Sequence, residues 1–259
     1  MMKKVNNRLA SYAAAAALLI VAGPLRAEHT DPHIESSIKK SYVFKTFLKD
    51  DAIKVESKAG IVTLTGTVAD DSRKSLAQET ASEMPGVKSV DNRLEIKGER
   101  PAVHSDAWLL VKVTTTLLFH RHVSASQTKV DVNDGVATLK GEATSQAQKD
   151  LTAEYVKDVE GIKDVKNEMT VAKAPEKPAE SLGELIDDAS ITAQVKISLL
   201  SHRSTSALRT KVKTTEGVVT VSGQAKNPAE KDLVTKLVED IRGVKSVVNN
   251  MTIDQARKD

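Results

Sequence analysis

The chain of 259 residues contains no cysteine. It therefore has no disulfides, no thiolate metal ligands, no cysteine nucleophile and no cysteine that could carry a lipid anchor. Aromatic residues are also scarce at 3%, and Trp108 is the only tryptophan. A fold with so few rings has little with which to stack bases or to build an aromatic sugar-binding platform.

The chain also has little net charge over most of its length. The first 27 residues hold four basic residues and no acidic one, so the formal charge of +3 becomes −1 for the remainder. A nucleic-acid-binding surface needs an excess of Lys and Arg to neutralise phosphates. We therefore expect no nucleic-acid partner, while 40% hydrophobic and 28% charged residues are typical of a globular protein.

The N-terminal residues have the order of a secretory signal peptide. Residues 1–8 are basic, residues 9–25 are mainly Ala, Leu, Ile and Val, and Arg26-Ala27 leads into polar residues. This order predicts a signal peptide over 1–27, cleaved after Ala27, and a periplasmic mature chain that is not lipidated. A retained membrane anchor is the alternative, although about 17 apolar residues lie at the lower limit for crossing a bilayer.

Three copies of one unit follow. A first motif has the sequences GIVTLTG, GVATLKG and GVVTVSG, at residues 60–66, 135–141 and 217–223. A second motif has the sequences GVKSVDN, GIKDVKN and GVKSVVN, at residues 86–92, 161–167 and 243–249. In every copy the two motifs begin 26 residues apart. The repeat predicts domains over 31–98, 104–172 and 184–254, with a linker at 173–183.

Each copy has the pattern helix, strand, strand, helix, strand. Helically spaced apolar residues come first, and a glycine-containing turn joins two alternating runs into a hairpin. N-cap residues then lie at Asp70, Ser145 and Asn227. The last strand alternates apolar with polar residues, so that one face is covered. We therefore predict an α+β fold of three tandem αββαβ domains, each with two helices on one face of a three-stranded mixed sheet.

Several residues recur in all three copies and are expected to serve the fold. Gly86, Gly161 and Gly243 end the second helix and are expected to have left-handed backbones. An asparagine on the inward side of the last strand is expected to bond to backbone near the hairpin rather than to a ligand. The full set of repeated structural residues is Gly60, Gly66, Gly86, Asn92, Gly135, Gly141, Gly161, Asn167, Gly217, Gly223, Gly243 and Asn249.

Candidates for catalysis are weak. The tripeptide His120-Arg121-His122 aligns with His202-Arg203-Ser204, and with Lys45-Thr46-Phe47 in the first copy, in the loop after the first helix. A hydrolase needs a nucleophile beside a histidine and an orienting acid, and no copy repeats such a set. Because the chemistry of this loop changes between copies, we expect it to be solvated and expect no catalytic residue.

Candidates for metal binding have simpler explanations as well. His29, Asp31 and His33 have the types of metal ligands, but a polar tail before the first helix accounts for them. The segment from Asp131 to Gly135, with Glu142, resembles a calcium loop whose glycine comes one position early. A tight hairpin turn explains it better. We expect no metal and no cofactor, and we identify no small-molecule substrate.

The repeated motifs resemble the BON domain, which is found in periplasmic osmotically inducible proteins, in outer-membrane lipoproteins and beside secretin pores. Three such domains would cover about 31–254. The resemblance implies a non-enzymatic domain that attaches to phospholipid or to envelope components. This chain departs from some members of the family because it has neither a lipidated cysteine nor a peptidoglycan-binding module.

The first helix of the second copy carries extra apolar residues. Trp108, Val111 and Leu118 lie toward the side opposite its inward residues, and Lys112 is nearby. These four residues form a candidate surface for lipid or for a partner protein, since Trp favours the headgroup boundary. An exposed Trp108 would indicate lipid binding, whereas a Trp108 buried between copies would indicate packing.

The sequence thus favours a non-enzymatic periplasmic protein of the envelope or osmotic-stress type, which binds a phospholipid membrane surface or envelope components. The alternative is a chaperone-like or scaffold protein that contacts other envelope proteins through its open sheet faces.

Overall fold

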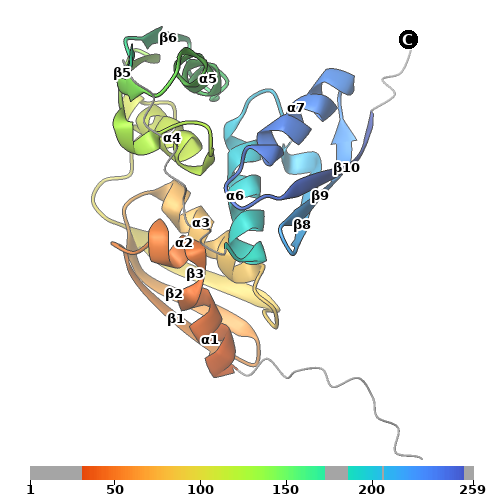
Figure 1. Ribbon diagram of the computed structural model, residues 1–259. Coiled ribbons are helices and arrows are strands. Elements are labelled where there is room, and N and C mark those ends of the chain that lie inside the picture. Colours follow the sequence, from red (N-terminus) through yellow and green to blue (C-terminus); the bar gives the residue numbers. More distant parts are fainter. Residues whose placement is uncertain (1–30, 173–185, 206, 254–259) are drawn as a thin grey trace, which may run out of the picture.

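The computed structural model describes residues 31–172, 186–205 and 207–253, and Figure 1 shows three successive units of the same architecture. The expected signal peptide and the expected linker at 173–183 lie outside the described residues. Among the residues described, no helix combines the length and the apolar character that crossing a bilayer requires.

Each unit begins with helix and ends with strand. Unit 1 contains α1 (Asp31–Lys40), α2 (Tyr42–Thr46), β1 (Ala52–Lys58), β2 (Ile61–Val68), α3 (Asp71–Ser82) and β3 (Ser89–Ile96). Unit 2 contains α4 (Asp106–Phe119), the 3-10 turn η1 (Ala125–Gln127), β4 (Thr128–Asn133), β5 (Val136–Ala143), α5 (Gln146–Lys157), β6 (Asp164–Asn167) and β7 (Thr170–Val171). Unit 3 contains α6 (Asp188–Ser201), the 3-10 turn η2 (Ala207–Arg209), β8 (Thr210–Thr215), β9 (Val218–Ala225), α7 (Pro228–Glu239) and β10 (Ser246–Ile253).

The sheets are mixed, as the sequence predicts. In unit 1 the hairpin pairs β1 with β2 antiparallel, and β3 then returns parallel to β2, so that β2 is central. Unit 3 has the same order, with β9 in the centre. In unit 2 the third strand is interrupted and pairs with β5 as two short pieces, β6 and β7. The predicted α+β fold of three αββαβ units is confirmed.

Local sequence explains where the second helices begin. The side chains of Asp70, Ser145 and Asn227 accept hydrogen bonds from the backbone N–H three residues later, at 2.9, 3.1 and 2.8 Å. Each bond satisfies one of the backbone donors that the first turn of a helix leaves unpaired. At the other end, Gly86, Gly161 and Gly243 have φ of 90°, 94° and 90°.

The first helix of unit 1 differs from its counterparts because it breaks at Ser41. The Ser41 hydroxyl donates to the carbonyl of Ile38 at 2.8 Å and caps α2 by accepting from the N–H of Phe44. The break leaves Val43 buried with Ile34 and Ile38. Tyr42, which the helical spacing assigns to the core, is only half-buried.

A carboxylate at the start of each first helix holds the hairpin turn of its own unit. Asp106 accepts from the N–H groups of Asp134 and Gly135 at 2.8 and 2.9 Å. Asp31 and Asp188 make the same pair of bonds in units 1 and 3. These bonds from Gly60, Ser57 and Ala59 hold the pKa of Asp31 below its ordinary value.

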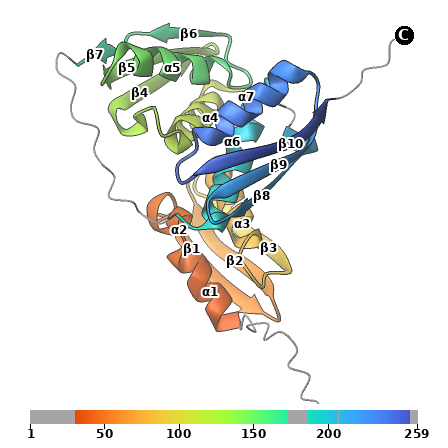
Figure 2. The same cartoon turned by 45° about the vertical axis from the view of Figure 1, so that its right-hand side comes forward.

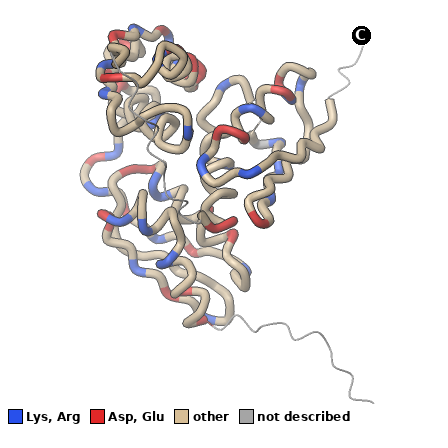
Figure 3. The backbone as a smooth tube through the Cα atoms, viewed as in Figure 1, with Lys and Arg blue, Asp and Glu red and all other residues tan. Residues whose placement is uncertain are grey.

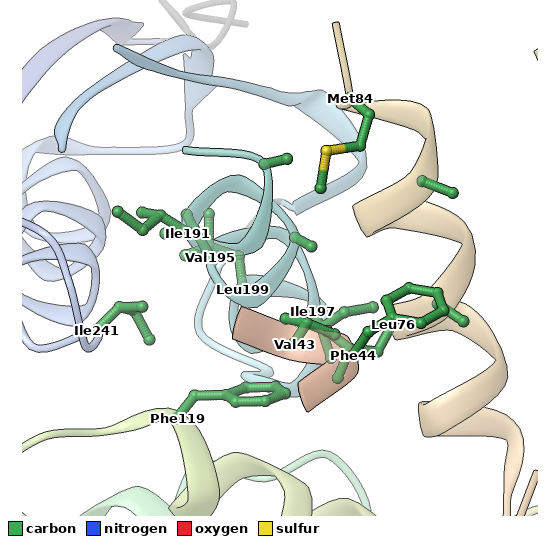
Figure 4. Close-up of a cluster of buried hydrophobic side chains, with 14 of the residues drawn as sticks. Val43, Phe44, Leu76, Met84, Phe119, Ile191, Val195, Ile197, Leu199 and Ile241 are labelled. Atoms are coloured by element: carbon green, nitrogen blue, oxygen red, sulfur yellow. The ribbon is translucent and has the colours of Figure 1, made fainter. Parts of the chain in front are cut away.

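Helix α6 is the centre of the molecule. It packs against α3 of unit 1 and against α4 of unit 2 as well as against its own sheet, and 11 of its 14 residues are buried. Buried side chains of units 1 and 3, together with Phe119 of unit 2, form one continuous hydrophobic cluster. Figure 4 shows this cluster, with Ile197 near Leu76 and Phe44 of unit 1 and Ile191 on the opposite side of α6. Unit 2 has a separate core.

Candidate functional site

Trp108 lies in a groove to which all three units contribute. The groove has a volume of about 300 Å³, and we call it the Trp108 groove. Its lining residues are Trp108, Val111 and Lys112 on α4, Ile197, Leu200 and Ser201 at the end of α6, Asp70, Asp71, Ser72 and Ser75 at the start of α3, and Pro101. Trp108 is half-buried, while Leu200 is 47% exposed. Trp108 is therefore neither an open patch nor a fully buried packing residue.

Lys112 is held close to the tryptophan. Its ammonium lies 4.3 Å from the centroid of the Trp108 ring, within the range of a cation–π interaction. It also lies 3.4 Å from the Glu160 carboxylate. With Asp70 and Asp71 in the wall, the Trp108 groove presents charges of both signs. This arrangement differs from a cationic patch for anionic headgroups.

Leu118 is separated from the other three candidate residues. It lines a slot of about 320 Å³ between units 1 and 2, where its neighbours include Phe47, Leu76 and Phe119. The structure thus brings Trp108, Val111 and Lys112 together and places Leu118 in a different depression. Figure 3 shows that basic and acidic residues are interspersed along the traced chain.

Units 2 and 3 contact each other through equivalent segments, which pair reciprocally. We call this contact the joint: residues 119–122 and 155–160 of unit 2 with 198–204 and 240–244 of unit 3. Arg121 N–H donates to Asp240 O and Arg242 N–H donates to Phe119 O, at 2.9 and 3.2 Å. The reciprocal pair runs from Arg203 to Asp158 and from Glu160 to Ser201, at 2.9 and 3.2 Å. Figure 2 shows α4 and α5 beside α6 and α7.

Buried histidines face carboxylates across the joint. His120 Nδ1 lies 2.9 Å from Asp240, and His202 Nδ1 lies 2.9 Å from Asp158. Both imidazole side chains have no exposed surface. Asp240 also accepts from the Tyr155 hydroxyl at 2.6 Å and contacts His122. The Tyr155 ring stacks on His120, with 4.0 Å between centroids.

These surroundings shift the ionisation of the buried groups. Burial lowers the pKa of His120 below its ordinary 6.5, despite the neighbouring Asp240. Burial alone would raise the pKa of Asp240, but hydrogen bonds from His120 and Tyr155 outweigh it and hold that pKa below 3.8. Burial also raises the pKa of Tyr155. At neutral pH the joint therefore places a neutral His120 beside an ionised Asp240.

The expectation of a solvated loop at His120 and His202 is wrong. His120 and His202 are buried between units, because each has a carboxylate partner in the other unit, whereas the residues that follow them, Arg121, His122, Arg203 and Ser204, are exposed. Sequence reasoning did not find Asp158, Asp240 or Tyr155. A signal was present, since Asp follows the second helix and His-Arg follows the first helix in units 2 and 3, whereas unit 1 has Glu83 and Lys45-Thr46.

The repeated asparagines bond to the second helix rather than near the hairpin. Asn249 Nδ2 donates to the carbonyl of Lys231 at 2.9 Å, and its Oδ1 accepts from Met251 N–H at 3.0 Å. Asn92 and Asn167 make equivalent bonds. The Lys231 ammonium donates to Met251 O at 2.7 Å. The side chains of Asn249 and Lys231 therefore bond to the N–H and the carbonyl of Met251 on the edge strand β10. Backbone groups that are already bonded are not available to pair with a strand of another chain.

The metal candidates do not converge. Asp134 and Gly135 occupy a tight hairpin turn with φ of 51° and 79°, and their N–H groups, rather than oxygens, meet Asp106. Asp31 is bonded to its hairpin, and His29 lies outside the described residues. Within the described part of the chain, no three His, Asp or Glu side chains are grouped as metal ligands.

A family model decides the relationship. The BON domain model matches residues 30–98, 105–173 and 187–255. The chain belongs to the BON domain family. Its three matches correspond to the three units of the structure, and the recurring motifs of the sequence lie within them.

Curated relatives are similar over much of their length. Osmotically-inducible protein Y of Escherichia coli K12 is 29% identical over 200 residues, which is 77% of this chain and 96% of the relative. Outer membrane lipoprotein DolP of Haemophilus influenzae is 30% identical over 125 residues, which is 45% of this chain and 64% of the relative.

Solved structures are more distant. CdsD, a structural protein of the type III secretion system of Chlamydia trachomatis, is 16% identical over 85% of this chain and 90% of its own, with a TM-score of 0.24. This score is too low to bear on how the three units are arranged.

Proposed function

We propose that this BON-family chain is a non-enzymatic protein of the bacterial envelope that binds phospholipid surfaces through the Trp108 groove. The observation that carries the proposal is the opening at Trp108, where an indole and the exposed Leu200 share a groove with Lys112 and Asp71. An indole at an apolar surface with a polar rim suits the boundary between headgroup and acyl chain. The relatives support an envelope role through their names, which describe an osmotically inducible protein and an outer membrane lipoprotein.

The attachment is expected to be weak. Trp108 is already half-buried, so transfer of its remaining apolar surface contributes about 1–2 kcal/mol. Lys112 is shared with Glu160, and the acidic residues of the wall offset attraction to anionic lipid. We therefore expect binding that depends little on headgroup charge and that becomes stable only when several molecules act together.

Co-sedimentation with vesicles of zwitterionic and of anionic phospholipid tests the proposal. Trp108→Ala should lower the bound fraction at both compositions and leave the unfolding midpoint within a few degrees of the wild type. The matched control is Val248→Ala, because Val248 is 44% exposed but lies on β10, outside the groove. Binding unaffected by Trp108→Ala, or a collapse of the fold with no binding to lose, would contradict the proposal.

A scaffold that contacts envelope proteins is the second candidate. The joint favours it, because two BON units recognise each other there through paired backbone bonds and His–Asp contacts. Cross-linking of the intact chain to soluble BON-domain proteins, compared with vesicle binding, separates the two candidates. The scaffold predicts specific adducts and no vesicle binding.

A further inference from the structure

The joint between units 2 and 3 has the composition of an acid-sensitive contact. Two histidines without exposed surface lie in it, and their ring centroids are 5.7 Å apart. Each histidine uses Nδ1 for a carboxylate of the other unit. On the other side of the ring, His120 Nε2 lies 3.4 Å from the Ser198 hydroxyl, whereas His202 Nε2 has no hydrogen-bond partner among the described residues. His120 has no exposed surface, so bulk solvent does not reach its ring to stabilise a second proton.

The groups around His120 come from every element that packs on it. Asp240 and Arg242 follow α7, His202 and Arg203 follow α6, Tyr155 and Asp158 belong to α5 and its end, and Arg121 and His122 belong to its own loop. Asp240 favours a positive charge on His120, but it already receives hydrogen bonds from Tyr155 and His122 as well. His202, His122 and the arginines oppose that charge. Burial adds to this opposition, so the docked histidine is neutral.

We propose that the joint is a pH switch that closes at neutral pH and opens in acid, separating unit 2 from unit 3. The closed joint binds fewer protons than the open one, because His120 and the two carboxylates take up protons more readily when exposed to solvent than when docked. Falling pH therefore favours opening, first through the imidazole and then through the carboxylates.

The pH window follows from the shifted groups. A histidine whose pKa is lowered by docking stabilises the closed form fully above its ordinary 6.5, and that contribution is lost as the pH falls below 6.5. Asp240 and Asp158, whose pKa values lie below 3.8 when docked, act in the same direction as the pH falls below 3.8. Opening is thus expected to begin below pH 6.5 through His120, and loss of the carboxylate charges adds to it below pH 3.8.

Opening would expose apolar surface that is covered at neutral pH. Phe119, Val159 and Ile241 have no exposed surface in the closed joint. Most of the unit 2 core is separate from the cluster shared by units 1 and 3, so opening withdraws Phe119 from that cluster and leaves the rest of both cores in place. This inference does not depend on lipid binding at Trp108.

The absence of cysteine makes a distance measurement direct. Spin labels at Gln146→Cys on α5 and Asp232→Cys on α7, both exposed, report the separation of units 2 and 3 in the full chain. Electron–electron resonance from pH 7.5 to 4 should show the distance lengthening below pH 6.5 while the far-ultraviolet circular dichroism stays unchanged. His120→Asn, which keeps a donor for Asp240 but does not titrate, should lower the midpoint by at least half a pH unit. The matched control is His33→Asn, at an exposed position of α1, and it should leave the midpoint unchanged.

Several results would overturn the switch. These are a constant distance down to pH 4, an unshifted midpoint in His120→Asn, and loss of secondary structure at the same pH as opening. If units 2 and 3 of the His120→Asn variant are not docked at pH 7.5, the His120→Gln variant is measured instead. A measurement on the unsubstituted histidine needs neither variant: its imidazole resonances should change together with the distance, and titration of His120 within a closed joint would also refute the proposal.

Discussion

The imidazole of His120 and the carboxylate of Asp240 lie 2.9 Å apart although 120 residues separate them in the chain. Both side chains are almost fully covered by protein. Their contact, with its counterpart between His202 and Asp158, fixes how two units of the same fold meet. The joint therefore depends on side chains outside the individual cores.

Removal of the Asp240 charge should weaken the joint. Asp240→Asn keeps the size of the side chain but removes its negative charge and replaces one acceptor oxygen with an NH₂ group. The hydrogen bonds from Tyr155 and His120 should therefore be weakened or lost. We expect a loss of about 1–3 kcal/mol in the free energy of unfolding at pH 7.5. Urea denaturation measures it, and Asp232→Asn on the exposed side of α7 is the control. Equal stability of the two variants would show that the contact is not stabilising.

The asparagine at the edge of each sheet can be tested within one strand. Asn249→Ala removes the bonds to Lys231 O and from Met251 N–H, whereas its neighbour Asn250 is exposed. We expect Asn249→Ala to cost about 1–3 kcal/mol and to speed hydrogen exchange at the Met251 amide. Asn250→Ala should change neither quantity. Similar exchange in both variants would argue against the role of Asn249.

The glycine after the last helix should tolerate no side chain. Gly243 has φ of 90°, and a Cβ there would lie 3.0 Å from Ile186 and Ile191. The left-handed backbone alone costs about 1–2 kcal/mol for an L-residue. Gly98 has a similar φ of 80°, but a Cβ there would have no atom within 4 Å. Gly98→Ala therefore measures the backbone cost without a steric clash. Gly243→Ala should therefore lower the free energy of unfolding by more than Gly98→Ala, and by more still as Gly243→Val.

The third unit should be able to fold alone but not to remain monomeric. Its hairpin, both helices and third strand lie within the fragment 181–259, which supports a native circular dichroism spectrum for that fragment. However, α6 buries Ile197 against unit 1 and unit 2 in the whole chain. We expect the isolated fragment to self-associate and to bind a hydrophobic dye, as measured by sedimentation and fluorescence. A random-coil spectrum, or a monomer that binds no dye, would contradict this expectation.

The sequence predicts the units well because their determinants are local and are repeated three times. N-caps, hairpin glycines and alternating strands each act within a few residues, and the three copies confirm one another. The interruption at Ser41 escapes this reasoning because its hydroxyl replaces a helical bond without breaking the apolar spacing.

The contacts between units are harder to predict because no spacing links their members. Ser190 of α6, for example, accepts from the N–H of Val43, which belongs to unit 1. Small polar residues on α6 are typical of a solvent-facing helix, yet Ser190, Ser198 and Ser201 are buried. The extra apolar residues of α4 predict contacts for unit 2, whereas α6 is the more buried helix. In the sequence, the joint is indicated only by the His-Arg pairs and the aspartates that recur at matching positions of units 2 and 3.

The central place of α6 has a consequence for the order of assembly. During synthesis units 1 and 2 emerge first, but the helix against which both of them pack belongs to the unit made last. Until that helix is present, Leu76 and Phe44 of unit 1 and Phe119 of unit 2 lack the neighbour that covers them. A newly made chain therefore has two folded units with uncovered apolar faces until α6 is synthesised. During that time these faces must be kept from contact with other molecules. A chain that terminates before α6 would keep those faces uncovered.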